Sequence, residues 1–404
     1  MMISICLYFK VHQPYMLNHF RSADIGRMRA YEDHQGDMVN INQAADACYL
    51  PANSLMLSLI EKYQGRFRVS FCISGTMMEL LNRYRPDVMS SFEKLSATNC
   101  VEFLGETYYN SLSWLYSKQE FKRQVEKHRQ SVLHYFNCIP SIFRNTDLIY
   151  NNDLGLLLRE MGFGGVLCEG VKGILEGRSN NLVYTVPGAT RMGLLLRHAR
   201  LSDDIAFRFE DKTWDQFPLT GEKFASWIRD LPQTDQVVNL FMDYETLGIH
   251  KKVESGIFDF LASFPQELLK RPELVFDTPS EVFRKYNPSG EYAVSNTISW
   301  DAHPGENNIV WNSNVRQHKM LKKISSMEKV VISSGDKAVL DRWGRLQAAD
   351  YFFGMVDGFH PDSCAAGSRS RRSFKENYES YSNIVTDFEL AIIRMSMKRI
   401  TGKT

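Results

Sequence analysis

Two acidic side chains follow one strongly apolar segment at a spacing that suits acid–base chemistry. Residues 237–242 are apolar apart from Asn239, which is typical of a buried strand, and Asp243 and Glu245 come directly after them. On an extended chain, residues i and i+2 point to the same side. Like charges held close raise the pKa of one carboxyl, which can then stay protonated near neutral pH and act as a general acid. A surface turn rich in acidic residues is the alternative interpretation.

Three further ionisable side chains follow other short apolar segments. Arg144 and Asp147 come after residues 141–143, and His12 closes the first apolar run of the chain. Arg144 could pair with an acid or hold a sugar hydroxyl, and Asp147 could be a nucleophile or the N-cap of a turn. His12 could present its imidazole to a ligand, with Pro14 fixing the backbone, or could be a structural histidine.

Short apolar runs alternate with segments of helical period over the first 280 residues. The runs span residues 3–11, 67–73, 101–104, 141–143, 165–167, 205–207, 237–242 and 274–276, and the helical segments include 51–63, 76–84, 119–136 and 152–161. Strands that alternate with helices predict βαβ units and a parallel sheet. Seven or eight such units favour a closed barrel, and an open doubly wound sheet is the alternative.

Polar residues collect where these predicted strands end. The residues concerned are His12, Ser74, Glu106, Arg144, Glu169, Asp243 and Asp277. In α/β barrels the active site lies at the carboxyl ends of the strands, where the loops converge. For Asp277, which precedes Thr278 and Pro279, we favour a helix N-cap instead.

The last third of the chain has a different character. A turn cluster at residues 287–290 is followed by segments of helical period at 307–324, 338–356 and 374–397. We therefore expect a barrel domain over residues 1–285 and a helical bundle over residues 286–404. A polar loop at 357–362 and a basic run ending in Arg371 and Arg372 are expected to be solvated.

Composition and charge exclude several classes of protein. The 404 residues carry 48 Lys and Arg against 47 Asp and Glu, whereas nucleic-acid binders usually have a basic excess. No apolar run is long enough for a membrane helix, and the N-terminus lacks the features of a signal peptide. The seven cysteines are scattered without CxxC spacing, so we expect no disulfide framework or zinc ribbon and a cytoplasmic location. Cys6, Cys72, Cys100 and Cys168 are predicted to be buried.

No motif indicates a cofactor. The chain has neither a GxGxxG nor a P-loop pattern. His12, Asp147, Asp243 and His250 could meet at one barrel mouth and hold a divalent metal, but no HxxxH or HxD spacing supports that alternative. We therefore expect neither a metal nor a nucleotide cofactor.

Four segments together resemble the motifs of glycoside hydrolase family 57, especially its α-amylase branch. They are residues 12–14 (HQP), 105–112 (GETYYNSL), 143–150 (FRNTDLIY) and 241–248 (FMDYETLG). Residues 346–352 and 386–389 also resemble the helical part of that family. The resemblance spans nearly the whole chain.

The resemblance implies a (β/α)7 barrel with a C-terminal helical region that acts on α-glucans such as maltooligosaccharides, with retention and without a metal. It implies that Asp243 is the acid/base and that Asp147 lies at the position of the nucleophile. It also implies that four residues surround the sugar subsites: His12, Glu106, Arg144 and Glu245.

The sequence departs from the family at Asp147, because the family has glutamate as its nucleophile. Retaining enzymes hold their two carboxyls about 5–5.5 Å apart, and a shortfall of roughly 1 Å could cost on the order of 10²-fold in rate. Residues 300–304 and 365–369 also match the family less well. We predict an α-glucan hydrolase or transglycosylase; the alternatives are a catalytically impaired relative that binds α-glucan and a metal-dependent carbohydrate hydrolase such as a deacetylase.

Overall fold

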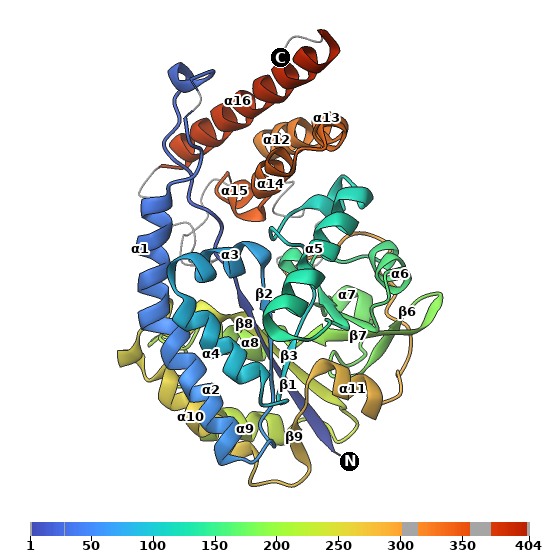
Figure 1. Cartoon of the computed structure of the whole chain (residues 1–404). Helices are drawn as coiled ribbons and strands as arrows, with labels where there is room; N and C mark the ends of the chain where they lie inside the picture. The colour runs from blue at the N-terminus through green and yellow to red at the C-terminus, as the bar shows by residue number, and fades with distance from the viewer. Residues whose placement is uncertain (1, 28, 301–313, 356–372, 402–404) are drawn as a thin grey trace.

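Seven parallel strands form a closed barrel (Figure 1). The computed structural model describes residues 2–27, 29–300, 314–355 and 373–401. Neighbouring strands follow one another around the barrel in chain order: β1 (Ile3–Val11), β2 (Val69–Ile73), β3 (Val101–Phe103), β4 (Ile142–Arg144), β5 (Gly165–Glu169), β7 (Ala189–Arg197) and β8 (Val237–Asp243), which pairs with β1. β3 and β4 meet through Gly105, whose N–H donates to Ile142 O and whose carbonyl accepts from Arg144 N, both at 2.8 Å. The predicted (β/α)7 barrel is confirmed.

Two short strands extend the sheet, and one predicted strand was wrong. β6 (Tyr184–Val186) pairs antiparallel with β7, and β9 (Leu274–Phe276) pairs with the first residues of β1. Residues 205–207 are not a strand, because they lie at the end of helix α8 (Ala199–Ala206), which buries Leu201 and Ile205 on one face. Such short apolar runs do not separate a strand from a buried helix face. The sixth barrel strand is β7, whose apolar pattern is interrupted by Arg191 and Gly193.

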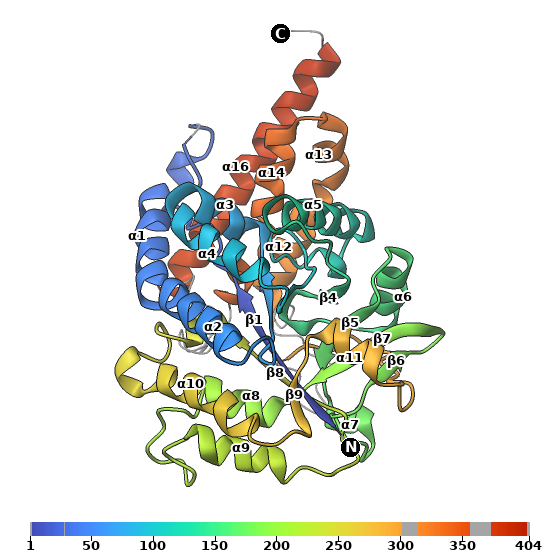
Figure 2. The same cartoon turned by 60° about the horizontal axis from the view of Figure 1, so that its bottom comes forward.

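Helices cover the outside of the barrel (Figure 2). They are α1 (His34–Ala44), a π-helical turn η2 (Ala45–Tyr49), α2 (Leu50–Lys62), α3 (Gly75–Tyr84), α4 (Pro86–Ser96), α5 (Lys118–Phe136), α6 (Asn152–Glu160), α7 (Lys172–Leu175), α9 (Gly221–Arg229), α10 (Ile257–Leu268) and α11 (Pro279–Lys285). The four predicted helices correspond to α2, α3, α5 and α6. Side-chain caps begin three of them: Ser74 accepts from Met77 N, Ser117 accepts from Glu120 N, and Asn151 accepts from Leu154 N.

A second group of helices stacks over one end of the barrel (Figure 1). They are α12 (Val315–Ser326), α13 (Glu328–Ser334), α14 (Lys337–Arg345), α15 (Ala349–Phe353) and α16 (Phe374–Thr401). The single helix predicted at 338–356 is split, because its middle residues bond to a barrel loop: Leu112 N donates to Gln347 O at 3.4 Å, and Ala349 N donates to Asn110 O at 2.9 Å. The polar loop at 357–362 and the basic run of Arg369, Arg371 and Arg372 lie outside the described residues.

The C-terminal helices share an apolar core with the barrel. Met320, Ile324 and Trp343 belong to the same buried cluster as Phe121 of α5 and Phe143 of β4. Because one apolar cluster includes residues from both sides of residue 285, the predicted domain boundary at that residue stays a prediction.

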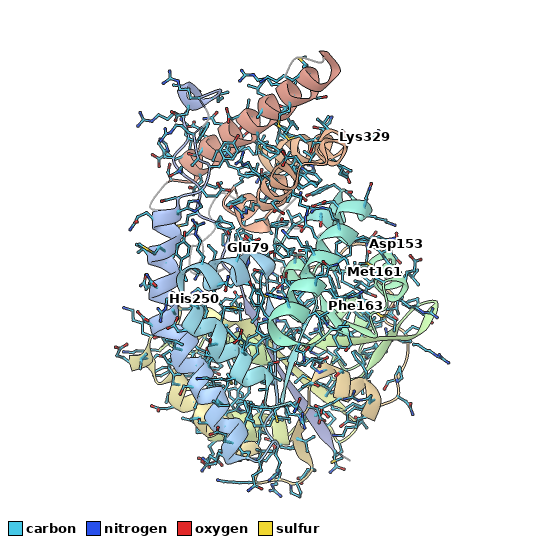
Figure 3. All side chains as sticks on the ribbon, in the orientation of Figure 1. Glu79, Asp153, Met161, Phe163, His250 and Lys329 are labelled. Carbon is cyan, nitrogen blue, oxygen red and sulfur yellow. The ribbon has the colours of Figure 1, made fainter. Side chains whose placement is uncertain are left out.

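Glu79 of α3 adds a polar contact between the barrel and the C-terminal helices. Figure 3 labels this residue on the side of α3 that faces them. Its carboxylate accepts from Tyr15 and Tyr108, both at 2.7 Å, and from Arg345 of α14 at 3.0 Å. The C-terminal helices are thus held on the barrel by polar as well as apolar contacts.

The barrel interior is filled by side chains and is closed at its amino-terminal end. Phe283 of α11 lies against Gly165 and Gly193, where any Cβ would overlap its ring. The helix N-cap predicted at residues 277–279 is present, but it is Thr278 and not Asp277: Thr278 caps α11, and its N–H donates to Glu281 at 2.9 Å.

The described cysteines carry free thiols. The four predicted to be buried are buried. No described helix combines the length and apolar character needed to cross a membrane.

Candidate active site

The predicted site residues lie at the carboxyl ends of the strands, below the C-terminal helices. His12 follows β1, Glu106 follows β3, Arg144 ends β4, and Asp243 ends β8. β1 and β8 pair so that Lys10 stands opposite Asp243. The residues predicted from separate motifs therefore meet at one barrel mouth.

Asp147 occupies a strained turn at this mouth. In η4 (Thr146–Leu148), Asp147 has φ 50° and ψ 32°, and Leu148 has φ 54°, which is left-handed backbone that non-glycine residues rarely adopt. Trp300 N donates to Asp147 O at 3.2 Å and fixes the turn from outside. Burial raises the pKa of Asp147, and the charges of Asp350 and Asp243 add to this shift. The positive charges of Lys10 and Arg144 oppose it.

Lys10 is a buried residue that the sequence analysis missed. Its ammonium lies 4.0 Å from Asp147 Oδ1 and donates to Asn110 Oδ1 at 2.8 Å. The signal for it was weak, because it stands inside an otherwise apolar run.

Asp243 and Glu245 have different environments. β8 ends at Asp243, and residues 244–246 form a 3₁₀ turn, η5 (Tyr244–Thr246), so the assumption of an extended chain through Glu245 was wrong. Asp243 is partly exposed at the mouth, whereas Glu245 is buried and accepts a short hydrogen bond from the Tyr49 hydroxyl. Burial, and then the charge of Asp243, raises the pKa of Glu245 to about 8.

The backbone around Tyr49 explains how Glu245 reaches this partner. Tyr49 ends the π-helical turn η2, and Pro51, which has no N–H, cannot donate to Ala47 O four residues earlier. Gly248 approaches that carbonyl so closely that a Cβ would overlap it, and its φ is 97°. Glycine is therefore required at position 248, and the loop after β8 is held against the π-helical turn.

Arg144 and Glu106 are buried charged residues with unused hydrogen-bonding atoms. The Arg144 guanidinium lies 4.7 Å from the centre of the Phe241 ring, and its Nε and Nη1 have no partner among the described residues. Glu106 Oε1 accepts from Cys72 Sγ at 3.3 Å, whereas Oε2 likewise has no partner in the described part of the chain. Unpaired buried donors and acceptors are costly, which favours a role in binding a polar ligand.

His12 is held between the barrel and a C-terminal helix. Its Nδ1 is hydrogen-bonded to Ser74 Oγ at 2.6 Å, and its Nε2 to Asp350 Oδ2 at 2.9 Å. Although burial opposes it, the pairing with His12 lowers the pKa of Asp350 to about 2, with help from Lys10 and Asn110. Asp350 lies on α15, and the sequence analysis did not predict it as a site residue.

The third alternative from the sequence required a metal at the mouth. Within the described ranges, no three or more His, Cys, Asp or Glu side chains are grouped so that they could hold a metal ion. His250 lies in the loop after η5, where its N–H donates to Glu245 O at 2.9 Å, and Figure 3 labels it on the flank of the molecule. The ionisable groups described at the mouth are carboxylates, a guanidinium, an ammonium and an imidazole.

A barrel with paired carboxylates at its mouth is typical of glycoside hydrolases. The profile of "Glycosyl hydrolase family 57" matches residues 6–295, and the chain belongs to this family. A Methanocaldococcus jannaschii protein described as a "Putative alpha-amylase" is 34% identical over 407 residues, which cover 98% of this chain and 86% of that protein.

Two solved structures share the fold. A 4-alpha-glucanotransferase from Thermococcus litoralis superposes with a TM-score of 0.68 at 15% identity, over 87% of this chain and 56% of its own. This chain therefore spans little more than half of that enzyme. A GH57 branching enzyme from Thermococcus kodakaraensis gives a TM-score of 0.67 at 12% identity, over 98% of this chain and 91% of its own.

Proposed function

We propose that this protein cleaves α-glucans such as maltooligosaccharides by a retaining double displacement, with Asp147 as nucleophile and Asp243 as acid/base. The observation that carries the proposal is the position of Lys10 between the two acids: its ammonium lies 4.0 Å from Asp147 Oδ1, and in the pairing of β1 with β8 it stands opposite Asp243, so both acids lie at one barrel mouth. Membership of glycosyl hydrolase family 57 supports it, as does the resemblance to a "Putative alpha-amylase".

In the first step, a carboxylate oxygen of Asp147 attacks the anomeric carbon. The bond from that carbon to the leaving oxygen breaks while Asp243 donates its proton to this oxygen, and a glycosyl ester forms on Asp147. In the second step, Asp243 takes a proton from water or an acceptor hydroxyl, whose oxygen displaces Asp147. Two inversions give net retention.

The surrounding residues bind and orient the sugar. Arg144 offers free N–H donors and Glu106 a free carboxylate oxygen, so sugar hydroxyls can satisfy both. Both ring nitrogens of His12 are already bonded, to Ser74 and to Asp350, so His12 acts by holding the Asp350 carboxylate at the mouth. Glu245, largely protonated near neutral pH, adds no second full charge beside Asp243.

Water and sugar acceptors compete in the second step. The named relatives include a glucanotransferase and a branching enzyme, so the acceptor is the part of the reaction that differs between such proteins. The free thiols of the described cysteines suit a reducing cytoplasm, where we place the reaction.

Product analysis on maltooligosaccharides tests the proposal. We expect the wild-type protein to release products whose anomeric configuration, followed by NMR, is retained, and Asp147→Asn and Asp243→Asn to lower cleavage by at least about 10³-fold. Asp153→Asn, an exposed change in the first turn of α6 (Figure 3), is the matched control and should leave cleavage unchanged. Glucan binding without cleavage by the wild type would instead favour a sugar-binding barrel.

A further inference from the structure

Lys10 is a charged side chain placed where burial is costly. Its side chain is 5% exposed, inside the barrel mouth at the end of β1. A buried ammonium is tolerated only when paired and hydrogen-bonded. The two groups that meet it are the carboxylate of Asp147 and the amide oxygen of Asn110.

Asn110 is oriented so that only its oxygen can face Lys10. The Asn110 Nδ2 donates to Asp350 Oδ2 at 3.2 Å, which leaves Oδ1 to accept from Lys10 at 2.8 Å. Asn110 has φ 50°, a conformation that asparagine adopts more readily than most residues. The ammonium is therefore held in one place by a residue that is itself fixed by a C-terminal helix.

Four charged groups act on Asp147, and they come from four elements of the fold. Lys10 of β1 and Arg144 of β4 favour the carboxylate, whereas Asp350 of α15 and Asp243 of β8 disfavour it. Of the two cations, Lys10 has the larger influence and forms the ion pair, while Arg144 lies over the ring of Phe241.

We propose that Lys10 is a positioning residue that holds the short side chain of Asp147 in place and keeps it ionised for attack. The inference rests on the proposed function of Asp147. The distance of 4.0 Å is too long for a hydrogen bond, so the ammonium attracts the carboxylate without occupying the lone pair that must attack.

The consequence for pH dependence has a definite sign. Lys10 favours the ionised form of Asp147, so its removal raises the pKa of that carboxyl. Since attack requires the carboxylate, the acid limb of kcat/KM should then move to higher pH. An opposite charge at this range typically shifts a carboxyl by about one to three pH units.

The experiment is the pH profile of kcat/KM on a maltooligosaccharide for the wild type, Lys10→Met and Lys10→Arg. We expect Lys10→Met to move the acid limb upward by at least about one pH unit, with a loss of roughly tenfold or more below that limb. Lys10→Arg should keep the limb near its wild-type position. Lys285→Met is the matched control. Lys285 also forms an ion pair, with its Nζ 2.8 Å from Asp277 Oδ2, but this pair lies at the amino-terminal end of the barrel.

The outcomes separate this inference from the proposed function. If Asp147→Asn retains cleavage, the assignment of the nucleophile fails. If Asp147→Asn is inactive but the acid limb of Lys10→Met matches those of the wild type and Lys285→Met, only the role of Lys10 is overturned. Circular dichroism and thermal unfolding establish that Lys10→Met is folded, and Lys10→Gln takes its place in the pH profile if it is not.

Discussion

The two ends of the barrel are built from the same strands but treat polar groups in opposite ways. At the amino-terminal end, Asp277 accepts from Ser4 and from Lys285, the latter at 2.8 Å, and Ser280 N donates to the partly buried Glu102 at 3.0 Å. At the mouth, Arg144 keeps unused donors and the backbone of Asp147 is left-handed.

This difference indicates that the amino-terminal end stabilises the molecule and that the mouth binds the ligand. Satisfied polar groups and a closely packed aromatic plug lower the energy of the folded state. Buried charged groups with unused hydrogen-bonding atoms raise it, and they persist where a ligand will use them. Substitutions at the two ends should therefore separate stability from activity.

The largest expected effect is that of Asp147→Gly at the mouth. Cleavage should fall by at least about 10³-fold because the nucleophile is removed. The free energy of unfolding combines two opposite changes: relief of the left-handed backbone, about 1 kcal/mol, and loss of the carboxylate that pairs with the buried Lys10. Urea unfolding and product analysis measure the two quantities. Glu176→Gly, at an exposed residue with φ 49°, is the control and should raise stability without loss of activity. A Glu176→Gly protein no more stable than the wild type would contradict the strain argument.

Phe283→Ala should have the opposite pattern at the amino-terminal end. Removing the ring that lies against Gly165 and Gly193 leaves a cavity, so the free energy of unfolding should fall by about 3 kcal/mol. Below the unfolding transition, kcat/KM should stay within about twofold of the wild type, because Gly165 and Gly193, which lie against the ring, are not site residues. A larger drop in kcat/KM would show that the two ends are not independent.

Asp350→Asn should weaken catalysis without removing a reacting group. The neutral amide no longer pairs with His12 or attracts Lys10, and loss of that orientation should lower kcat/KM roughly tenfold. Steady-state kinetics at pH 7 measure this, and Asp336→Asn, an N-cap on α14, controls for a general disturbance of the C-terminal helices. Equal effects of the two changes would argue against a specific role.

Asp350 should also contribute to stability in a pH-dependent way. Because its pKa is lowered to about 2, its contribution is complete above the unfolded value near pH 4 and is lost as the pH falls through about 2. The wild type and Asp350→Asn should therefore differ in stability at pH 6 and converge toward pH 2. Urea unfolding at several pH values follows the difference.

The smallest expected effect concerns Glu245. Its raised pKa means that the folded state retains a proton, so its stability contribution is complete below about pH 4.3 and is lost as the pH rises through about 8. Between pH 5 and pH 9, Tm should fall by about 2 °C more for the wild type than for Glu245→Gln. Parallel Tm curves would indicate that Glu245 is ionised throughout.

The barrel was predictable from the sequence because its signals are local. The apolar run before Asp243 and the nine residues of β1 are consecutive, and the polar residues after them mark the mouth. β7 was not predicted, because Arg191 and Gly193 interrupt its apolar pattern. The end of α8 was predicted as a strand, because residues 205–207 alone do not show the helical period.

The contacts of the site were less predictable because they connect distant segments. Asp350 and His12 are 338 residues apart in the chain, and no spacing relates them. Lys10 is the single charged residue of β1, and only closure of the barrel shows that it faces inward toward Asp147.

The contribution of α15 to the mouth has a consequence for how the protein matures on the ribosome. All seven barrel strands are synthesised before residue 244, yet the partner of His12 emerges more than one hundred residues later. Domains tend to fold as the chain emerges, amino-terminal parts first. A nascent barrel would therefore be assembled but inactive until the last quarter of the chain has been synthesised. Premature termination after the barrel would yield a protein without glucan-cleaving activity.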